Sequence, residues 1–259
     1  MAGDSPVETL QVRIHGAASL PTLIYLPGIH GDWTLVGDFR KQLVGHVRFV
    51  EFIYPRTLTW SLDDYAAAIE TALAKNHITH GWLLGESFGS QIVWALVKRN
   101  QFTAQGIILA GGFVNYPISW GVRLTYTTFG RIPLGALNGL LKVYGKLARL
   151  RYRHSPETVA NIQEFIERRT ELDRQAALHR LTLILGHDPR EIARTTPLSV
   201  FYVSGWVDPI VPWPLVRRWL RQQCPSLRAD KIIFPADHNV LGTAPVQAAR
   251  QVLAWMKLP

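Results

Sequence analysis

The sequence predicts an α/β fold with a mainly parallel sheet that helices cover on both faces. Short apolar runs of β-type composition alternate with helical patterns from residue 47 to 112, and the β pattern resumes at residue 198. Such alternation is typical of parallel strands joined by crossover helices. The chain has 259 residues, 47% of them hydrophobic, which is enough for one substantial core without a split into two domains.

The expected elements of the core follow one another in a simple order. Apolar runs predict strands over residues 22–25, 47–53, 81–84, 106–110, 198–203 and 231–234. Apolar residues at helical spacing predict helices over residues 62–76 and 244–258. We therefore expect residues 1–112 and 198–259 to form the α/β core.

The segment between residues 113 and 197 differs from the core, because it contains no comparable β run. Apolar residues recur there at helical spacing over 137–148, and further helical patterns cover 156–169 and 172–185. We expect these residues to form a helical cap that is inserted between two strands of the core.

A G-x-S-x-G motif lies at the end of one predicted strand. Gly85-Glu86-Ser87-Phe88-Gly89 follows the apolar run at 82–84 and precedes a helical run. A serine in such a turn projects its hydroxyl above the sheet and has backbone N–H groups beside it, which suits a nucleophile. The pentapeptide alone also fits an ordinary strand-to-helix turn, so its meaning depends on the rest of the chain.

Two further residues follow later strands in the order that this motif requires. Asp208 lies in the loop after the strand at 198–203, and His238 lies just past the strand at 231–234. Each residue alone has a structural interpretation, because Asp208 precedes Pro209 in a turn sequence and His238 could be a simple loop histidine. Together with Ser87, they predict a catalytic triad in the chain order Ser, Asp, His.

Two other acids lie close to the predicted triad in the sequence. Asp237 is adjacent to His238 in sequence and cannot readily reach the far side of its imidazole, so it competes only weakly with Asp208. Glu86 occupies the variable position of the motif, and we expect it to be a solvated or helix-facing carboxylate without a chemical role.

These residues make the chain resemble an α/β-hydrolase over most of its length. The resemblance includes Leu26-Pro27-Gly28-Ile29-His30-Gly31 after the strand at 22–25, where family members commonly carry a His-Gly pair before an oxyanion-hole residue. Pro27 stands where that histidine is usual, but the role belongs to the main chain. The resemblance implies that the N–H groups of Ile29 and Phe88 are the oxyanion donors. In an alternative register, His30-Gly31 is the pair and Asp32 is the donor.

The chemistry that this resemblance implies is hydrolysis of carboxylic esters or thioesters through an acyl-enzyme on Ser87. His238 would act as the base and Asp208 as the acid that orients it. The same triad could deliver the acyl group to an alcohol or amine, as in an acyltransferase. Carbon–carbon bond hydrolysis and cofactor-free perhydrolysis also occur on this fold, because a fold does not fix a chemistry.

Positive charge is concentrated in the predicted cap. The formal net charge is +9, and residues 123–153 contain no acidic residue but seven basic ones, Arg123, Arg131, Lys142, Lys146, Arg149, Arg151 and Arg153. This pattern fits an anionic membrane surface or an acidic acyl carrier, but also the solvated face of a packed helix. A non-catalytic protein that docks an acidic partner is a further alternative. No nucleic-acid-binding motif accompanies the charge.

Several other classes of protein are disfavoured by the sequence. Cys224 is the only cysteine, which excludes an internal disulfide and predicts a structural or surface thiol. His77 and His80 are three apart without a third ligand nearby, so we expect a surface turn, no metal and no cofactor. No secretory signal and no membrane-spanning run are evident, so we expect a cytoplasmic enzyme with a small-molecule substrate.

Overall fold

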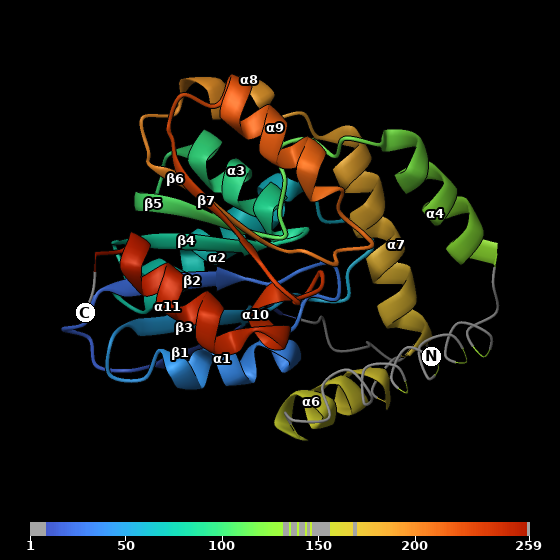
Figure 1. Ribbon diagram of the computed structural model, residues 1–259, viewed down its shortest axis with the longest axis horizontal. Coiled ribbons are helices and arrows are strands. Elements are labelled where there is room, and N and C mark those ends of the chain that lie inside the picture. The colour runs from blue at the N-terminus through green and yellow to red at the C-terminus, as the bar shows by residue number, and fades with distance from the viewer. Residues whose placement is uncertain are drawn as a thin grey trace, which may run out of the picture.

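A seven-stranded sheet forms the centre of the protein (Figure 1). The computed structural model describes residues 9–131, 156–167 and 170–257, together with the single residues 135, 139, 143 and 146. The strand order is β1-β3-β2-β4-β5-β6-β7, and every pairing is parallel except that of β1 with β3. The strands are β1 Gln11–His15, β2 Thr22–Leu26, β3 Arg48–Ile53, β4 His80–Glu86, β5 Thr103–Ala110, β6 Val200–Gly205 and β7 Leu227–Ile233.

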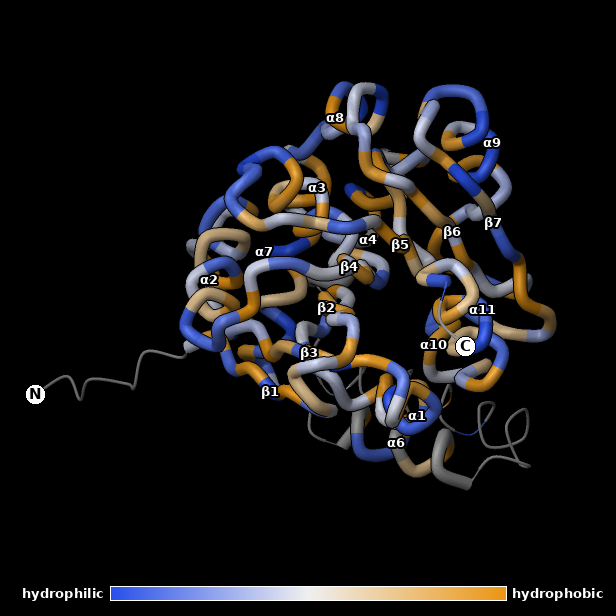
Figure 2. Tube along the Cα trace, turned by 90° about the vertical axis from the view of Figure 1, so that its left-hand side faces the viewer, coloured by the Kyte–Doolittle hydropathy of each residue, from blue (hydrophilic) through white to orange (hydrophobic). Residues whose placement is uncertain are grey.

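Burial explains which strands the sequence predicts. All side chains of β2 and β6 are buried, as expected of strands that are covered on both faces, and Figure 2 shows apolar residues along the central strands. The two edge strands, β1 and β7, expose part of their residues and carry mixed polar and apolar side chains. The sequence therefore misses β1 altogether and places the start of β7 four residues too late, at 231 instead of Leu227.

Helices cover both faces of the sheet, as predicted (Figure 1). One face carries α2 Leu62–Lys75, α3 Gly89–Arg99, α8 Arg190–Thr195 and α9 Trp213–Gln223. The other carries the 3-10 helix η1 Thr34–Val36 and the helices α1 Gly37–Gln42, α10 Val240–Thr243 and α11 Pro245–Trp255. Among the described residues, no helix is both long and apolar enough to cross a membrane.

The predicted helices of the core are present with small differences at their ends. Helix α2 matches the expected 62–76, and a reciprocal capping box starts it: the Asp64 N–H donates to Ser61 Oγ at 3.2 Å, and the Ser61 N–H donates to Asp64 Oδ2 at 2.8 Å. Helix α11 ends before the predicted residue 258. Cys224 follows α9 and is buried, so of the two expected roles it has the structural one.

The regular elements in the described part of the chain between β5 and β6, which we call the β5–β6 segment (residues 111–199), are helices. Besides α8, these helices are α4 Ser119–Arg131, α6 Pro156–Glu167 and α7 Glu171–Gly186. The last two match the helical patterns expected at 156–169 and 172–185. The helix expected over 137–148 lies outside the described residues except for positions 139, 143 and 146, which are helical.

Helix α7 connects the β5–β6 segment to the core. A capping box of Thr170 and Asp173 starts the helix, and α4 packs along it (Figure 1). Farther along, His179 Nε2 lies 2.8 Å from the carbonyl oxygen of Trp60, just before α2. The buried Arg180 follows in the next position. This face of α7 is thereby held against the loops at the carboxyl end of the sheet.

Candidate active site

Ser87 occupies a sharp turn between β4 and α3. Its backbone φ is +49°, a left-handed value that is uncommon for a residue with a side chain. A Cβ atom on Gly89 would lie 2.1 Å from the carbonyl oxygen of Leu26, and one on Gly85 would lie 2.8 Å from the Cα of Ser90. The tight turn that the motif predicts is therefore present, and both flanking positions require glycine.

Hydrogen bonds join this turn to the end of β5 and to the residues that follow it. The Ser87 N–H donates to the carbonyl oxygen of Ala110 at 3.0 Å, which ties the turn to the end of β5. Ser90 Oγ donates to the carbonyl oxygen of Ser87 at 2.6 Å and accepts from the Phe113 N–H at 3.1 Å. The Ser90 side chain is wholly buried. Sequence reasoning missed Ser90, because a serine early in a helix carries no distinctive signal.

The structure brings the three residues of the predicted triad into one hydrogen-bonded row. His238 Nε2 lies 2.9 Å from Ser87 Oγ, and His238 Nδ1 lies 2.8 Å from Asp208 Oδ2. The other carboxylate oxygen of Asp208 accepts the N–H groups of Ile210 and Val211 at 2.9 and 2.8 Å. The carboxylate is thus fixed by its own loop and buried, while Oδ2 faces the imidazole.

The sheet positions the two loops that carry Asp208 and His238. Strands β6 and β7 are parallel neighbours, and Gly205 pairs with Ile233 at their carboxyl ends. A Cβ atom on Gly205 would lie 2.1 Å from the carbonyl oxygen of Asp237. Glycine at this position therefore lets the His238 loop cross close to the end of β6, which brings the imidazole within reach of the Asp208 loop.

Opposing effects act on the pKa of His238. Burial favours the neutral imidazole and lowers the pKa, whereas the hydrogen bond and charge of Asp208, followed by the charges of Glu86 and Asp237, raise it. The acids prevail, so the pKa of His238 lies above its ordinary value. The imidazole is consequently well suited to take up a proton and stay charged beside Asp208.

The expected surroundings of Glu86 were wrong, because this side chain is neither solvated nor turned toward the helix. It is buried at the end of β4 and accepts a hydrogen bond from the Tyr25 hydroxyl on β2. Strand periodicity continues through Glu86 and places it on the same face as Leu84. Burial raises the pKa of the Glu86 carboxyl. The sequence signal was the strand pattern itself, which extends two residues beyond the predicted end at residue 84.

Asp237 contacts its own loop. Its Oδ1 accepts the Asn239 N–H at 3.0 Å and the Thr243 hydroxyl at 3.2 Å. These contacts order the turn that follows His238 and leads into α10. The oxygen that lies beside His238 Nδ1 comes instead from Asp208.

The loop after β2, residues 27–33, borders the nucleophile and is called the β2–η1 loop here. A Cβ atom on Gly28 would lie 3.5 Å from the Cβ of Ser87, so the backbone at Gly28 directly faces the serine. The Gly31 N–H donates to the Gly28 carbonyl oxygen at 2.9 Å, which closes a turn around Ile29 and His30. Both candidate donors of the sequence analysis, Ile29 and Asp32, thus belong to a short ordered loop.

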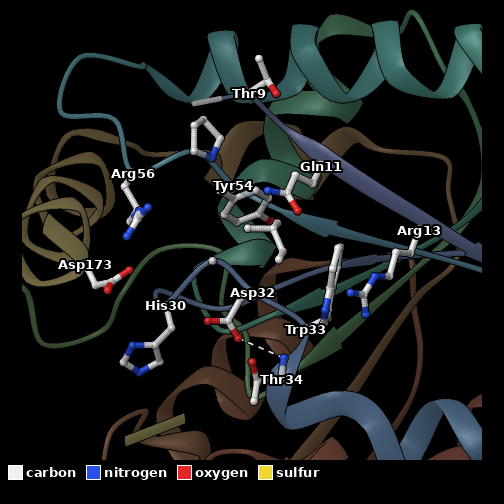
Figure 3. Close-up of a pocket in the computed structure, with 13 residues that line it drawn as sticks. Thr9, Gln11, Arg13, His30, Asp32, Trp33, Thr34, Tyr54, Arg56 and Asp173 are labelled. Carbon is white, nitrogen blue, oxygen red and sulfur yellow. Dashed lines mark hydrogen bonds between the residues drawn. The ribbon is translucent and has the colours of Figure 1, made fainter. Parts of the chain in front are cut away.

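The far side of the β2–η1 loop faces a cavity of about 410 Å³ (Figure 3). His30, Asp32 and Trp33 are among its lining residues. The Asp32 carboxylate accepts the Thr34 N–H at 3.0 Å, as the dashed line in Figure 3 marks, and so forms a side-chain turn just before η1. None of Ser87, Asp208 and His238 lines this cavity.

A buried arginine from α7 contacts the β2–η1 loop, and sequence reasoning missed it. Arg180 donates from Nη1 to the Ile29 carbonyl oxygen at 2.7 Å. A single arginine within a helical pattern reads as a surface residue, so no sequence signal indicated its burial.

The structure describes the side chains of only two of the seven basic residues in the predicted cap. Arg123 and Lys146 are exposed. The side chain of Arg131 and the residues Lys142, Arg149, Arg151 and Arg153 lie outside the described residues. Within the parts of the chain that the structure describes, no three His, Cys, Asp or Glu side chains gather as a metal site would require.

Comparison with known proteins agrees with this architecture. The family model of the alpha/beta hydrolase fold matches residues 51–245. Similar solved structures include a hydrolase from Pseudomonas aeruginosa PA01, with 15% identity, TM-score 0.79 and coverage of 95% of this chain and 94% of that one. An enol-lactonase from Burkholderia xenovorans LB400 has 17% identity, TM-score 0.77 and 96% coverage of both chains.

A third similar structure, an esterase from Rhodococcus sp. ECU1013, has 15% identity, TM-score 0.76 and coverage of 96% of this chain and 94% of that one. No curated protein sequence matches the chain significantly. At these identities the solved structures show a shared fold, while the family model covers most of the chain. The chain therefore belongs to the α/β-hydrolase fold family.

Proposed function

We propose that the protein is a serine hydrolase that cleaves carboxylic esters or thioesters through an acyl-enzyme on Ser87. The observation that carries this proposal is the hydrogen-bonded row from Ser87 Oγ through His238 to Asp208, with heavy-atom distances of 2.9 and 2.8 Å. The esterase and the enol-lactonase among the structural neighbours support hydrolysis at an acyl carbonyl.

The proposed mechanism follows from the charges in this row. Neutral His238 takes the proton of Ser87 as the hydroxyl oxygen attacks the acyl carbonyl, and Asp208 stabilises the resulting imidazolium. His238 then gives the proton to the leaving alcohol or thiol. In the second half-reaction, His238 activates a water molecule that releases the acid from Ser87.

Two backbone N–H groups would stabilise the oxyanion that forms in each step. The first is that of Phe88, directly after the nucleophile at the start of α3. For the second we propose Ile29 over Asp32, because a Cβ atom on the adjacent Gly28 would lie 3.5 Å from the Cβ of Ser87. Asp32 instead lines the cavity that Ser87 does not reach. Loss of one such donor costs roughly 3 to 4 kcal/mol in typical enzymes.

We also propose that the β5–β6 segment acts as the cap that selects the acyl group. Apolar side chains exposed in the Asp208 loop, those of Trp206, Val207 and Ile210, support an apolar acyl chain. The Tyr116 hydroxyl donates to the Ile210 carbonyl oxygen and so joins the segment to this loop.

A panel of p-nitrophenyl esters and acyl thioesters, graded by acyl length, tests the proposal. The variants Ser87→Ala and His238→Ala should lose at least about 10³-fold in kcat, and a fluorophosphonate probe should label wild type at Ser87 but not Ser87→Ala. Ser19→Ala and His80→Ala change exposed residues of the same types and serve as controls. His80 starts β4, at the opposite end of the strand from Ser87. Wild-type turnover in Ser87→Ala would overturn the proposal.

The same panel separates hydrolysis from acyl transfer. With a competing alcohol or amine present, a hydrolase releases mainly the free acid, whereas an acyltransferase releases the new ester or amide. Absence of probe labelling in folded protein, together with salt-sensitive binding to anionic vesicles or an acidic acyl carrier, would instead favour a docking protein with a basic cap.

A further inference from the structure

Arg180 is a completely buried arginine that reaches from α7 to the loops around the candidate active site. Only 1% of its surface is exposed. It donates from Nη1 to the Ile29 carbonyl oxygen at 2.7 Å, from Nη2 to the Pro55 carbonyl oxygen at 3.0 Å and from Nε to the Tyr65 hydroxyl at 3.4 Å. One side chain thus joins the β5–β6 segment to the β2–η1 loop, to the loop after β3 and to α2.

The surroundings of the guanidinium indicate that its position is specified. A buried charge is costly unless it is hydrogen-bonded, and the planar guanidinium directs its donors at two fixed carbonyl groups. The rings of Tyr54 and Tyr65 lie 5.5 and 6.0 Å from its central carbon, within the range of cation–π attraction. The charge is therefore held by oxygen dipoles and ring faces on several sides.

The β2–η1 loop is shaped to receive this guanidinium. A Cβ atom on Gly31 would lie 2.7 Å from Nη1 and 2.9 Å from Cζ of Arg180, and the backbone φ of Gly31 is +77°. Only glycine therefore lets the loop lie flat against the arginine. The Gly31 carbonyl oxygen also accepts the N–H of Tyr54, the residue after β3, at 2.8 Å, so Tyr54 and Arg180 both hold the loop.

We propose that Arg180 is a positioning residue, through which helix α7 holds the β2–η1 loop in the conformation that presents the Ile29 N–H to the substrate oxyanion. By binding the Ile29 carbonyl oxygen, the guanidinium fixes the peptide that follows Ile29 and limits rotation of its neighbour, the Gly28–Ile29 peptide. This inference rests on the proposed function. It adds that the proposed cap contributes to transition-state binding through a residue that does not touch the substrate.

Kinetics of the full-length protein test this role. Arg180→Met keeps most of the apolar stem but removes every donor, and it should lower kcat on a p-nitrophenyl ester by roughly 10- to 100-fold while KM changes less than about threefold. Arg180→Lys keeps one charged donor and should recover part of the loss. Arg174→Met is the matched control, because Arg174 lies on the same helix and pairs with Glu171.

A second pair of variants tests the same contact if Arg180→Met does not fold. Gly31→Ala keeps Arg180 in the sequence but directs a methyl group into the space of its guanidinium, so it should displace the contact and reproduce the loss of kcat. Gly45→Ala is its control, because Gly45 has a similar φ of +82° with no atom within 4 Å of the added Cβ. Equal kcat values for these two variants, or for Arg180→Met and Arg174→Met, would overturn the proposal.

Hydrogen exchange supplies a readout that does not depend on activity. In Arg180→Met, amides of a peptide covering residues 27–33 should exchange faster than in wild type, and in Arg174→Met they should not. Unchanged exchange in folded Arg180→Met would also contradict the role of Arg180. If wild type and Ser87→Ala hydrolyse esters equally, the proposed function fails, whereas the exchange measurement still decides whether Arg180 holds the loop.

Discussion

The turn at Ser87 and the β2–η1 loop meet at the candidate active site, but different parts of the chain hold them. The turn is shaped by its neighbours Gly85, Gly89 and Ser90. The end of β5 anchors it through the hydrogen bond from the Ser87 N–H to Ala110. The loop instead depends on Arg180, which lies 151 positions after Ile29 in the sequence. The comparison indicates that the nucleophile is built into the core, whereas one proposed oxyanion donor depends on the β5–β6 segment.

Substitution of Asp208, at the far end of the hydrogen-bonded row, should have the largest effect on kcat. It leaves both the turn and the loop intact, so the loss reports on the imidazole alone. In Asp208→Asn, the amide oxygen can still accept the N–H groups of Ile210 and Val211, but the amide NH2 then faces His238 Nδ1 and favours the wrong tautomer. We expect kcat to fall by about 10⁴-fold with little change in thermal stability. A loss below tenfold, measured on the preferred ester, would contradict the assignment of Asp208.

A methyl group at Gly89 should break the turn where it meets the end of β2 and the first residue of the β2–η1 loop, without touching Arg180. The added Cβ would lie 2.1 Å from the Leu26 carbonyl oxygen, a backbone atom that cannot move aside easily. We expect Gly89→Ala to lose about 3 kcal/mol in free energy of unfolding, measured by urea titration.

Gly186→Ala is the control for this change, because nothing lies within 4 Å of its added Cβ at the end of α7. It should be neutral or more stable by a few tenths of a kcal/mol, since alanine favours helix. Similar unfolding free energies for the two variants would show that the turn tolerates a side chain at Gly89.

Tyr65→Phe tests how much the weakest hydrogen bond of Arg180 contributes to holding the loop. It removes the acceptor of the longest of the three Arg180 hydrogen bonds, at 3.4 Å, but keeps the ring that packs near Tyr54 and Phe88. We expect a loss of about 1 kcal/mol in stability and a fall in kcat of less than about threefold. A loss as large as that of Arg180→Met would mean that the hydroxyl, not the two carbonyl contacts, controls the loop.

Glu86→Gln should have the smallest effect, a shift of the pH profile. His238 must be neutral to act as a base, so kcat/KM should rise with pH and have its midpoint above 6.5, the ordinary pKa of histidine. Negative charge on Glu86 stabilises the imidazolium. Its removal lowers the pKa of His238 and moves the midpoint to lower pH, while the plateau at high pH stays nearly the same. A shift to higher pH would contradict this role for Glu86.

How far the sequence predicts the fold depends on burial. Fully buried strands such as β2 and β6 are continuous apolar runs and were predicted nearly at their observed ends. The edge strand β1 pairs antiparallel to β3 and alternates exposed and partly buried residues, so its five residues gave no comparable signal. The burial of Glu86 was missed because the strand was expected to end at residue 84.

The sequence by itself identified the candidate catalytic residues, because the patterns around them are local. The spacing of glycines around Ser87 and the order of Asp208 and His238 after their strands are linear properties of the chain, and they indicate the family and the expected chemistry. Parallel strands that end at the same edge of a sheet then bring such residues together.

Only the tertiary structure decided the surroundings of that chemistry. The contact of Arg180 with Ile29, its fit against Gly31 and the burial of Glu86 against Tyr25 join segments that are far apart in the chain. Helical periodicity and composition report how a segment is patterned, but not which distant backbone carbonyl a buried side chain will meet. Packing in three dimensions selects that partner, because a buried charged group is costly unless the groups around it form hydrogen bonds with it.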